Sequence, residues 1–402
     1  MPDKPSRGPL ADLRVVEMGS LIAGPFCGQL LGDFGAEVIK IEDPVKGDAM
    51  RGWRMDKATD VSLWFPVIGR NKKSVTLDLR TVEGQTLARD LVAKADIVVE
   101  NFRPGALEKW GLDYATLAAI QPGLIMARVS GYGQSGPYRD RTGFGAVGEA
   151  MGGLRHITGD PDRPPARAGI SIGDSLAATY AAMGVLMALH HRHATGRGQM
   201  IDSTLYEATL AMMENTVTEY AHTGHIRERS GSILPKIAPS NAYPCLGGEM
   251  VLIAGNQDNI FVRLCEAMDT PDLARDPRFS THAARGETQR VLDDIIGAWT
   301  ATRTAQDVLA LMEQYSVPAG RIYRAPEMLA DPHFAAREAI IETEHPVLGM
   351  LKMQGAFPKL SATPGEVRWP GPALGAHNEE IWGGLMGCSV QRLAELKARR
   401  VI

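Results

Sequence analysis

The residue best suited to covalent chemistry is Asp174, which directly precedes a strongly apolar helical pattern. An Asp just before a helix is a common N-cap, because its side chain accepts hydrogen bonds from the first free N–H groups. The same position also suits catalysis, since the positive end of the helix dipole keeps a carboxylate ionised and localised, as a carboxylate nucleophile must be. A structural and a catalytic interpretation of Asp174 therefore both stand.

Two other motifs suggest chemistry that their surroundings oppose. Residues 131–136 match G-x-G-x-x-G, but Pro137 follows at once and no amphipathic helix opens there, which favours a turn or a loop for a ligand other than a nicotinamide. Residues 169–173 match G-x-S-x-G, which would make Ser171 an esterase nucleophile with a downstream partner such as His377. That motif needs a buried strand before it, and the prolines and charges of residues 160–167 disfavour one.

Basic residues gather in two groups at or near the ends of predicted strands. In open parallel sheets, ligands bind outside the carboxyl ends of the strands, so we expect a small molecule that carries phosphate. The two groups are Arg51, Arg54, Lys57, Arg70, Lys72, Lys73 and Arg80, then Arg103, Lys109, Arg139 and Arg141.

The elements that must position these residues alternate between short β-rich runs and helical patterns, which predicts an α/β fold with a parallel sheet and crossover helices. Strands are predicted at 13–18, 37–41, 74–79, 97–101 and 124–129, with a helix over 82–95. Residues 131–173 read as a long functional loop. A helix follows with an apolar stripe of Leu176, Tyr180, Met183 and Met187 and a second apolar face formed by Val185 and Leu189, so we expect it to be central. It ends near Gly196, and another helix runs over 205–220.

Near Gly231 the pattern changes to prolines, a strand at 250–254 and helices up to about 315, which predicts a second, smaller α+β domain. We expect a large domain over 1–225, a small domain over 226–325, and a return to the large domain over 326–402. The last part is extended, with a final helix at 390–397.

Composition excludes several classes of protein. The 402 residues are 44% apolar and carry a formal charge of −4, so no global positive field attracts nucleic acid or an acidic membrane. The four cysteines lie far apart, which argues against zinc and disulfides and favours the cytoplasm. The N-terminus lacks the apolar core of a signal peptide, and the run over 176–189 is too short to span a bilayer, so we expect a soluble, unprocessed chain.

Several segments together resemble the family III CoA-transferases, which include formyl-CoA transferase, carnitine CoA-transferase and the divergent 2-methylacyl-CoA racemases. The resemblance covers nearly the whole chain, and the order and spacing of the segments carry it. They are AGP at 23–25, GAEVIKIE at 35–42, NKKSVTLD at 71–78, VENFRPG at 99–105, GY at 131–132, GD at 173–174 and TGRGQ at 195–199, with weaker matches at 317–320, 331–332 and 374–377.

The resemblance implies a Rossmann-like large domain, an inserted small domain and two ring-shaped subunits interlocked as a homodimer. It implies CoA and acyl-CoA as substrates, without a metal, and assigns the nucleophile to Asp174, which would pass through an aspartyl anhydride and an aspartyl-CoA thioester. The implied CoA contacts are Leu21, Ile22, Ala23, Leu77, Arg80, Asn101, Phe102, Arg103, Lys109, Arg141 and Phe144, with Thr142 nearby.

Three departures from the family pattern narrow the activity. The racemases place a His before an acid where this chain reads Gly143-Phe144-Gly145, and phenylalanine cannot take a proton. The run of glycines in formyl-CoA transferase is absent at 230–235, which argues against oxalate as the acceptor. Asp43 stands where formyl-CoA transferase offers CoA an arginine, so phosphate recognition would shift to Arg80, Lys109 or Arg141.

Residues 142–153 and 167–174 resemble the branch that uses succinyl-CoA and dicarboxylic acids such as malate, citramalate or itaconate. Arg155 or Arg167 could pair with the second carboxylate of such an acid. We therefore expect a succinyl-CoA:dicarboxylate CoA-transferase. The alternatives are a 2-methylacyl-CoA racemase, a formyl-CoA:oxalate CoA-transferase, an esterase and a non-catalytic CoA-binding protein.

Overall fold

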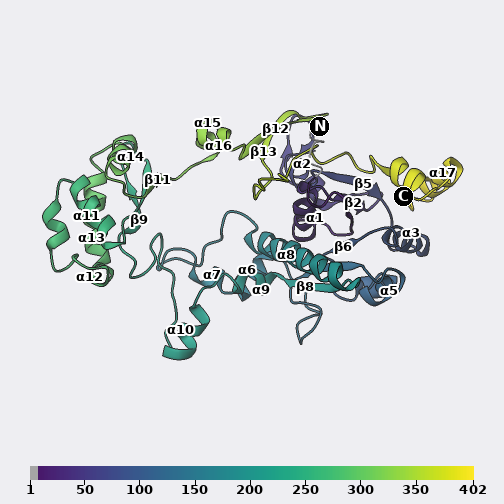
Figure 1. Cartoon of the computed structure of the whole chain (residues 1–402), viewed down its shortest axis with the longest axis horizontal. Coiled ribbons are helices and arrows are strands. Elements are labelled where there is room, and N and C mark those ends of the chain that lie inside the picture. Colours follow the sequence, from purple (N-terminus) through teal and green to yellow (C-terminus); the bar gives the residue numbers. More distant parts are fainter. Residues whose placement is uncertain (1–7) are drawn as a thin grey trace. The chain divides into compact units, whose positions relative to one another are not determined.

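A computed structural model describes residues 8–402. The expectation of an unprocessed N-terminus depends partly on residues 1–7, which lie outside the described residues. The chain forms two compact units, which Figure 1 draws as ribbons. The first unit runs to Leu154 and continues over Ala168–Thr218 and Pro332–Ile402. The second unit consists of Arg155–Arg167 and Glu219–Asp331.

The first unit is built on a six-stranded sheet in which every neighbouring pair is parallel. Its order is β5-β2-β1-β6-β7-β8, so the chain reverses its direction of travel across the sheet between β1 and β6, as in doubly wound sheets. The strands are β1 Arg14–Glu17, β2 Glu37–Glu42, β5 Lys72–Thr76, β6 Ile97–Glu100, β7 Ile125–Ser130 and β8 Met200–Thr204. The predicted parallel sheet is confirmed. The sequence analysis missed β8, an edge strand whose first three residues are not buried.

Helices cover both faces of this sheet because its strands alternate their buried side chains between two cores. Val15 and Val99 join the core beneath α1 (Ala23–Asp33) and α8 (Ile172–Thr195), which lie side by side (Figure 1). Val16 and Val98 join the core on the other face. The elements there are α3 Val82–Val92, α4 Ala106–Trp110, α5 Tyr114–Ile120, the π-helix η3 Glu379–Leu385 and α17 Val390–Ala398.

The central helix α8 buries only some of the residues predicted for its apolar faces: Val185 is fully buried, and Leu176, Tyr180 and Leu189 pack partly buried against the core. Its buried face consists mainly of alanines, whereas Met183 and Met187 are 43% and 59% exposed. Small side chains allow close approach to α1 and the sheet, which a stripe of larger residues would prevent. By length and composition alone α8 could cross a membrane, but 39% of its most apolar window is buried in the protein. Its end at Gly196, with φ of 72°, agrees with the prediction.

Two other expectations about helices were wrong. The long loop predicted at 131–173 contains α6 (Gly145–Met151) and α7 (Leu154–Ile157), because several small residues concealed the helical pattern. The helix predicted over 205–220 is two helices, α9 (Leu205–Leu210) and α10 (Thr216–Thr223). The chain turns between them, where Glu214 has a φ of 50° that helical backbone does not allow.

The C-terminal part of the first unit returns to the edge of the large sheet. Asn378 Oδ1 accepts a hydrogen bond from Thr76 N at 2.9 Å, and Val401 O accepts one from Asp78 N at 2.8 Å. The helix predicted at 390–397 is confirmed as α17. The remaining elements are η1 Ala49–Gly52, β3 Met55–Asp56, β4 Val61–Ser62, α2 Phe65–Ile68, α16 Pro332–Ala336, β12 Ile340–His345 and β13 Gly349–Gln354.

The second unit has its own core, between an antiparallel sheet of order β11-β10-β9 and a group of helices. The strand predicted at 250–254 is β10 (Met250–Ala254). The other elements are β9 Ser240–Pro244, α11 Asp258–Ala267, η2 Pro271–Arg275, α12 His282–Glu287, α13 Gln289–Thr300, α14 Ala305–Gln314, β11 Ala319–Arg321 and α15 Ala325–Ala330.

Candidate active site

A cavity of about 340 Å³ opens at the carboxyl ends of four neighbouring strands of the large sheet. Each strand contributes residues at its end or in the segment that follows it, and Trp110 at the end of α4 completes the wall. The cavity lies beside the point where the strand order reverses, the usual ligand site of an open parallel sheet. The lining residues are Met18, Gly19, Ser20, Ile41, Glu42, Asp43, Lys46, Gly47, Asp48, Ala49, Leu77, Asp78, Leu79, Arg80, Phe102 and Trp110.

Three of the predicted CoA contacts, Leu77, Arg80 and Phe102, meet in this cavity. Arg80 is exposed and forms ion pairs with Asp78 at 2.7 Å and Asp43 at 3.0 Å. Burial opposes ionisation of Asp43, but nearby backbone N–H groups and Arg80 together hold its pKa below the ordinary value. Arg80 therefore offers a guanidinium at the cavity, although two carboxylates already compete for it.

Phe102 is held by a buried carboxylate at the end of β6. Glu100 Oε2 accepts a hydrogen bond from Phe102 N at 2.7 Å, and Glu100 Oε1 accepts one from Arg128 Nε at 2.7 Å. Burial raises the pKa of Glu100 to about 7, against the opposing effect of Arg128. The Phe102 ring meets the edge of Trp110 at a centroid distance of 5.3 Å, so an aromatic pair forms one wall.

The predicted contacts Leu21, Ile22 and Ala23 form the loop that follows β1 and enters α1. Ile22 and Ala23 are 8% and 4% exposed, so this loop presents its backbone rather than those side chains. Asn101 fixes the loop: its side chain accepts from Ser20 N and donates to Ser20 O, both at 2.9 Å. The amide of Asn101 is thus engaged in positioning the loop.

The other predicted contacts are exposed and do not line this cavity. Arg103 donates to the carbonyl of Asp140, and the Arg141 guanidinium lies 3.6 Å from the ring centroid of Tyr138. Lys109 lies in α4, and Phe144, 61% exposed, directly precedes α6. The structure therefore brings together part of the predicted set and leaves these four outside the cavity wall.

Asp174 lies in the first turn of α8, not at its N-cap, because the helix already begins at Ile172 and Ser171 takes the flanking position. The capping interpretation of Asp174 is therefore wrong, although the helix dipole still favours its charged form. The side chain is half-buried and lies against the first residue of α6: a Cβ on Gly145 would come within 2.7 Å of Asp174 Cγ. This glycine leaves room for the carboxylate.

The neighbourhood of Asp174 is packed closely by small residues that the sequence analysis did not select. A Cβ on Gly173 would lie 3.1 Å from Gly145 O and 3.2 Å from Glu149 Cγ, and Glu149 is only 1% exposed. The spacing of Gly145, Gly148 and Gly152 could have revealed a helix with a bare face there. The Asp174 carboxylate is thus partly exposed and closely packed by backbone, and it does not line the 340 Å³ cavity.

The rejected motifs remain unsupported. No strand precedes Ser171 in the described residues 159–170, so the esterase elbow lacks its structural context. Residues 131–136 form bends and turns that no helix directly follows, as predicted. Within residues 8–402, no group of three or more His, Cys, Asp or Glu side chains could hold a metal ion.

Comparison with known proteins identifies the family of this chain. The family model for CoA-transferase family III matches residues 10–378. The chain is 60% identical over 394 residues to the succinyl-CoA–D-citramalate CoA-transferase of Chloroflexus aurantiacus, covering 98% of each chain. It is 36% identical over 388 residues to the succinate–glutarate CoA-transferase of Agrobacterium fabrum, covering 95% of this chain and 97% of that protein.

A solved structure of a CAIB/BAIF family protein from Brucella suis aligns with a TM-score of 0.83 at 35% identity, covering 94% of this chain and 99% of that one. Both the sequence and the fold therefore agree with the resemblance drawn from scattered motifs. CoA thioesters are the substrates of enzymes of this kind. On these matches, the chain is a CoA-transferase and belongs to family III of these enzymes.

Proposed function

We propose that this enzyme moves CoA from succinyl-CoA to a small dicarboxylic acid, with Asp174 as the covalent nucleophile. Two relatives described above are named for succinyl-CoA or succinate together with a second dicarboxylic acid, D-citramalate or glutarate. The observation that carries the mechanism is the half-buried Asp174 carboxylate in the first turn of α8, resting against Gly145.

A carboxylate nucleophile explains how exchange proceeds without ATP. Asp174 attacks the thioester carbon of succinyl-CoA, the C–S bond breaks, and CoA leaves as the thiolate, which gives a succinyl-aspartyl anhydride. The thiolate then attacks the aspartyl carbonyl, releasing succinate and forming an aspartyl-CoA thioester. Each intermediate keeps the free energy of the original thioester, which an acyl-serine ester would lose.

The second half of the reaction runs the same chemistry with the acceptor. The acceptor carboxylate attacks the aspartyl-CoA thioester and expels CoA thiolate, which leaves an anhydride between Asp174 and the acceptor. The thiolate attacks the acceptor carbonyl, forms the new acyl-CoA and frees the Asp174 carboxylate. Backbone N–H groups near the start of α8 would stabilise the developing oxyanions.

We assign the CoA moiety to the 340 Å³ cavity, with Arg80 at its phosphates and Phe102 as an apolar wall. The Leu21–Ala23 backbone would contact the bound CoA from the adjoining loop. Arg103, Lys109, Arg141 and Phe144 would then contact the parts of CoA that extend beyond the cavity, while Arg155 or Arg167 would meet the second carboxylate of the acid.

We also propose that two copies interlock through the family's ring-shaped arrangement, with the two compact units as its Rossmann-like large and inserted small domains. The exposed apolar face of α8, which includes Met183, Leu186 and Met187, is a surface that a partner subunit would cover. All four cysteines are free thiols, which suits a reducing compartment such as the cytoplasm.

The test combines a substrate panel with covalent trapping. Labelled succinyl-CoA incubated with a series of dicarboxylic acids should transfer CoA to at least one, and Asp174→Ala and Asp174→Asn should lower exchange to a few per cent or less while still binding CoA. Treating the enzyme with succinyl-CoA and then hydroxylamine or borohydride should modify Asp174 alone, as read by mass spectrometry.

Two outcomes would overturn the proposal. Normal exchange by Asp174→Asn would exclude the covalent mechanism, and a label on another residue would reassign the nucleophile. Deuterium exchange at the α-carbon of a 2-methylacyl-CoA without CoA transfer would favour a racemase, although Gly143-Phe144-Gly145 offers no base.

A further inference from the structure

Four charged side chains form a buried row beneath the loop that follows β1. Lys72 Nζ lies 2.8 Å from Glu17 Oε2, Glu17 Oε1 lies 2.9 Å from Lys40 Nζ, and Lys40 Nζ lies 2.8 Å from Asp48 Oδ2. None of the four is more than 3% exposed. The row contains equal numbers of positive and negative charges. Buried ion pairs add little net stability compared with apolar packing, so a row of this length points to a role in fixing a particular geometry.

The row holds the backbone of residues 19–25 at three points. Lys40 Nζ donates to Gly19 O at 2.8 Å, and Lys72 Nζ donates to Pro25 O at 2.6 Å. Asp48 Oδ1 accepts a hydrogen bond from Leu21 N at 3.0 Å. Leu21 has a φ of 65°, in the left-handed region that a leucine adopts only when its surroundings hold it there.

Asp48 connects this loop to a second segment of the same cavity wall. Its own backbone N donates to Glu42 Oε2 and its side chain accepts from Met50 N, both at 2.9 Å, which fixes residues 46–49 beside the end of β2. Gly19 and Ser20 line the cavity from one loop, and Gly47 and Ala49 line it from the other. The Asp48 carboxylate is thus a bridge between the two loops.

We propose that Asp48 is a positioning residue for acyl-CoA, which acts by holding Leu21 and thereby setting the separation of the two loops that flank the CoA cavity. This inference rests on the proposed binding of CoA in that cavity. Lys40 keeps Asp48 ionised: burial opposes the charge, but the adjacent ammonium holds the pKa of Asp48 below its ordinary value. Loss of the carboxylate would release Leu21 from the left-handed conformation and weaken acyl-CoA binding.

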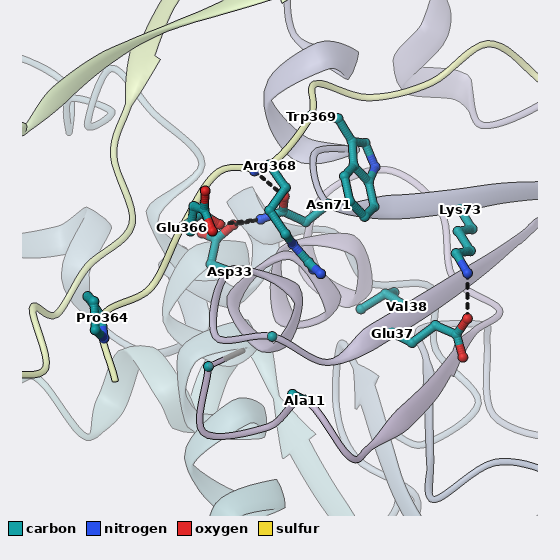
Figure 2. A pocket seen from close by; sticks show the side chains of 12 residues that line it. Ala11, Asp33, Glu37, Val38, Asn71, Lys73, Pro364, Glu366, Arg368 and Trp369 are labelled. Atoms are coloured by element: carbon teal, nitrogen blue, oxygen red, sulfur yellow. Dashed lines mark hydrogen bonds and ion pairs between the residues drawn. The ribbon is translucent and has the colours of Figure 1, made fainter. Parts of the chain in front are cut away.

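Asp33 provides a matched control for the structural cost of losing a buried carboxylate. Asp33 is also 3% exposed and pairs with Arg70, at 2.5 Å. It lines a different cavity, of about 440 Å³, where Figure 2 shows it beside Asn71, Glu366 and Arg368. The Asp33 carboxylate accepts hydrogen bonds from Arg70 and Asn71, neither of which belongs to the two loops of the CoA cavity. Loss of Asp33 should therefore affect stability alone.

The experiment compares Asp48→Ala, Asp48→Asn and Asp33→Ala in the full-length enzyme. Asp48→Ala should raise KM for succinyl-CoA and Kd for CoA about tenfold or more, with kcat changed only a few-fold, because it removes a hydrogen bond to a charged acceptor. Asp48→Asn keeps an oxygen for Leu21 N, so it should fold well and show a smaller shift. Asp33→Ala should lower Tm comparably and leave KM and Kd unchanged.

Equal shifts of KM in Asp48→Ala and Asp33→Ala, or unchanged CoA affinity in both Asp48 variants, would overturn the inference and leave Asp48 a purely structural residue. Failure of the proposed function is a separate result. In that case the wild-type enzyme itself would bind no CoA, or would bind it without any dependence on Arg80 and Phe102.

Discussion

Replacing Gly145 by Ala tests whether the position of the Asp174 carboxylate matters for exchange. The added Cβ would lie 2.0 Å from Asp174 Oδ2 and 2.7 Å from Asp174 Cγ, whereas non-bonded heavy atoms in contact are separated by about 3.5 Å. The Asp174 carboxylate must therefore move by at least about 1 Å, a displacement that can lower the rate of an oriented reaction by about 100-fold. The carboxylate is the end of a flexible side chain and Ala favours helix, so stability should change by less than about 1 kcal/mol.

The assay is kcat for exchange between succinyl-CoA and its best acceptor, together with thermal unfolding. Gly148→Ala in the same helix is the control, since its Cβ would lie 2.5 Å from Leu205 Cβ and away from the nucleophile. The control should lose stability and keep its activity per folded molecule, whereas Gly145→Ala should show the reverse. Full activity in Gly145→Ala would refute the claim that catalysis depends on this placement of Asp174.

Three other outcomes are expected. Arg80→Ala should raise KM for acyl-CoA about tenfold but leave KM for an acyl-pantetheine substrate unchanged, because only CoA carries the phosphates. An equal rise in KM for both substrates would contradict this. The pKa of Glu100 is raised from 4.5 to about 7 by folding, so the folded protein binds this proton more tightly than the unfolded chain does. The free energy of unfolding should therefore fall as the pH rises from 4.5 to about 7. The fall should be about 3 kcal/mol larger in the wild type than in Glu100→Gln. Met187→Glu places a charge on the exposed apolar face of α8 and should weaken self-association in sedimentation experiments, whereas Thr86→Glu on α3 should not. An unchanged oligomer in Met187→Glu would exclude the exposed apolar face of α8 from the interface.

The parallel sheet was predictable because short strand-like runs alternate with helical patterns along the chain. Residues 97–101 are apolar until the strand ends, whereas residues 37–41 include Lys40, whose buried charge is paired with Glu17 and Asp48. Polar and charged residues then follow at the carboxyl ends of the strands, and these residues predicted a ligand site there. The edge strand β8 lacked this signal because its residues are largely uncovered.

The packing of α8 could not be predicted from periodicity, since the helix is apolar on several sides. Hydrophobicity did not separate the exposed Met183 and Met187 from the buried Val185. Packing density instead places Ala177 and Ala181 in the core, where their small side chains let the helix lie close to α1. The row of buried charges was equally hidden. Glu17, Lys40 and Lys72 lie on three strands, and only the strand order brings them into contact.

The contact between Asp174 and Gly145 supports the proposal that Asp174 is a nucleophile and not only a carboxylate that stabilises a helix. An Asp that only stabilises a helix needs the N–H groups of the first turn and nothing else. The residue that faces it from a neighbouring helix could then be of any small type. Here the facing residue, Gly145, can be only a glycine without displacing the carboxylate. A nucleophile, by contrast, must bond successively to an acyl group, to CoA sulfur and to the acceptor, so its oxygens need a fixed position. A bare backbone at Gly145, facing a half-buried carboxylate, meets that requirement.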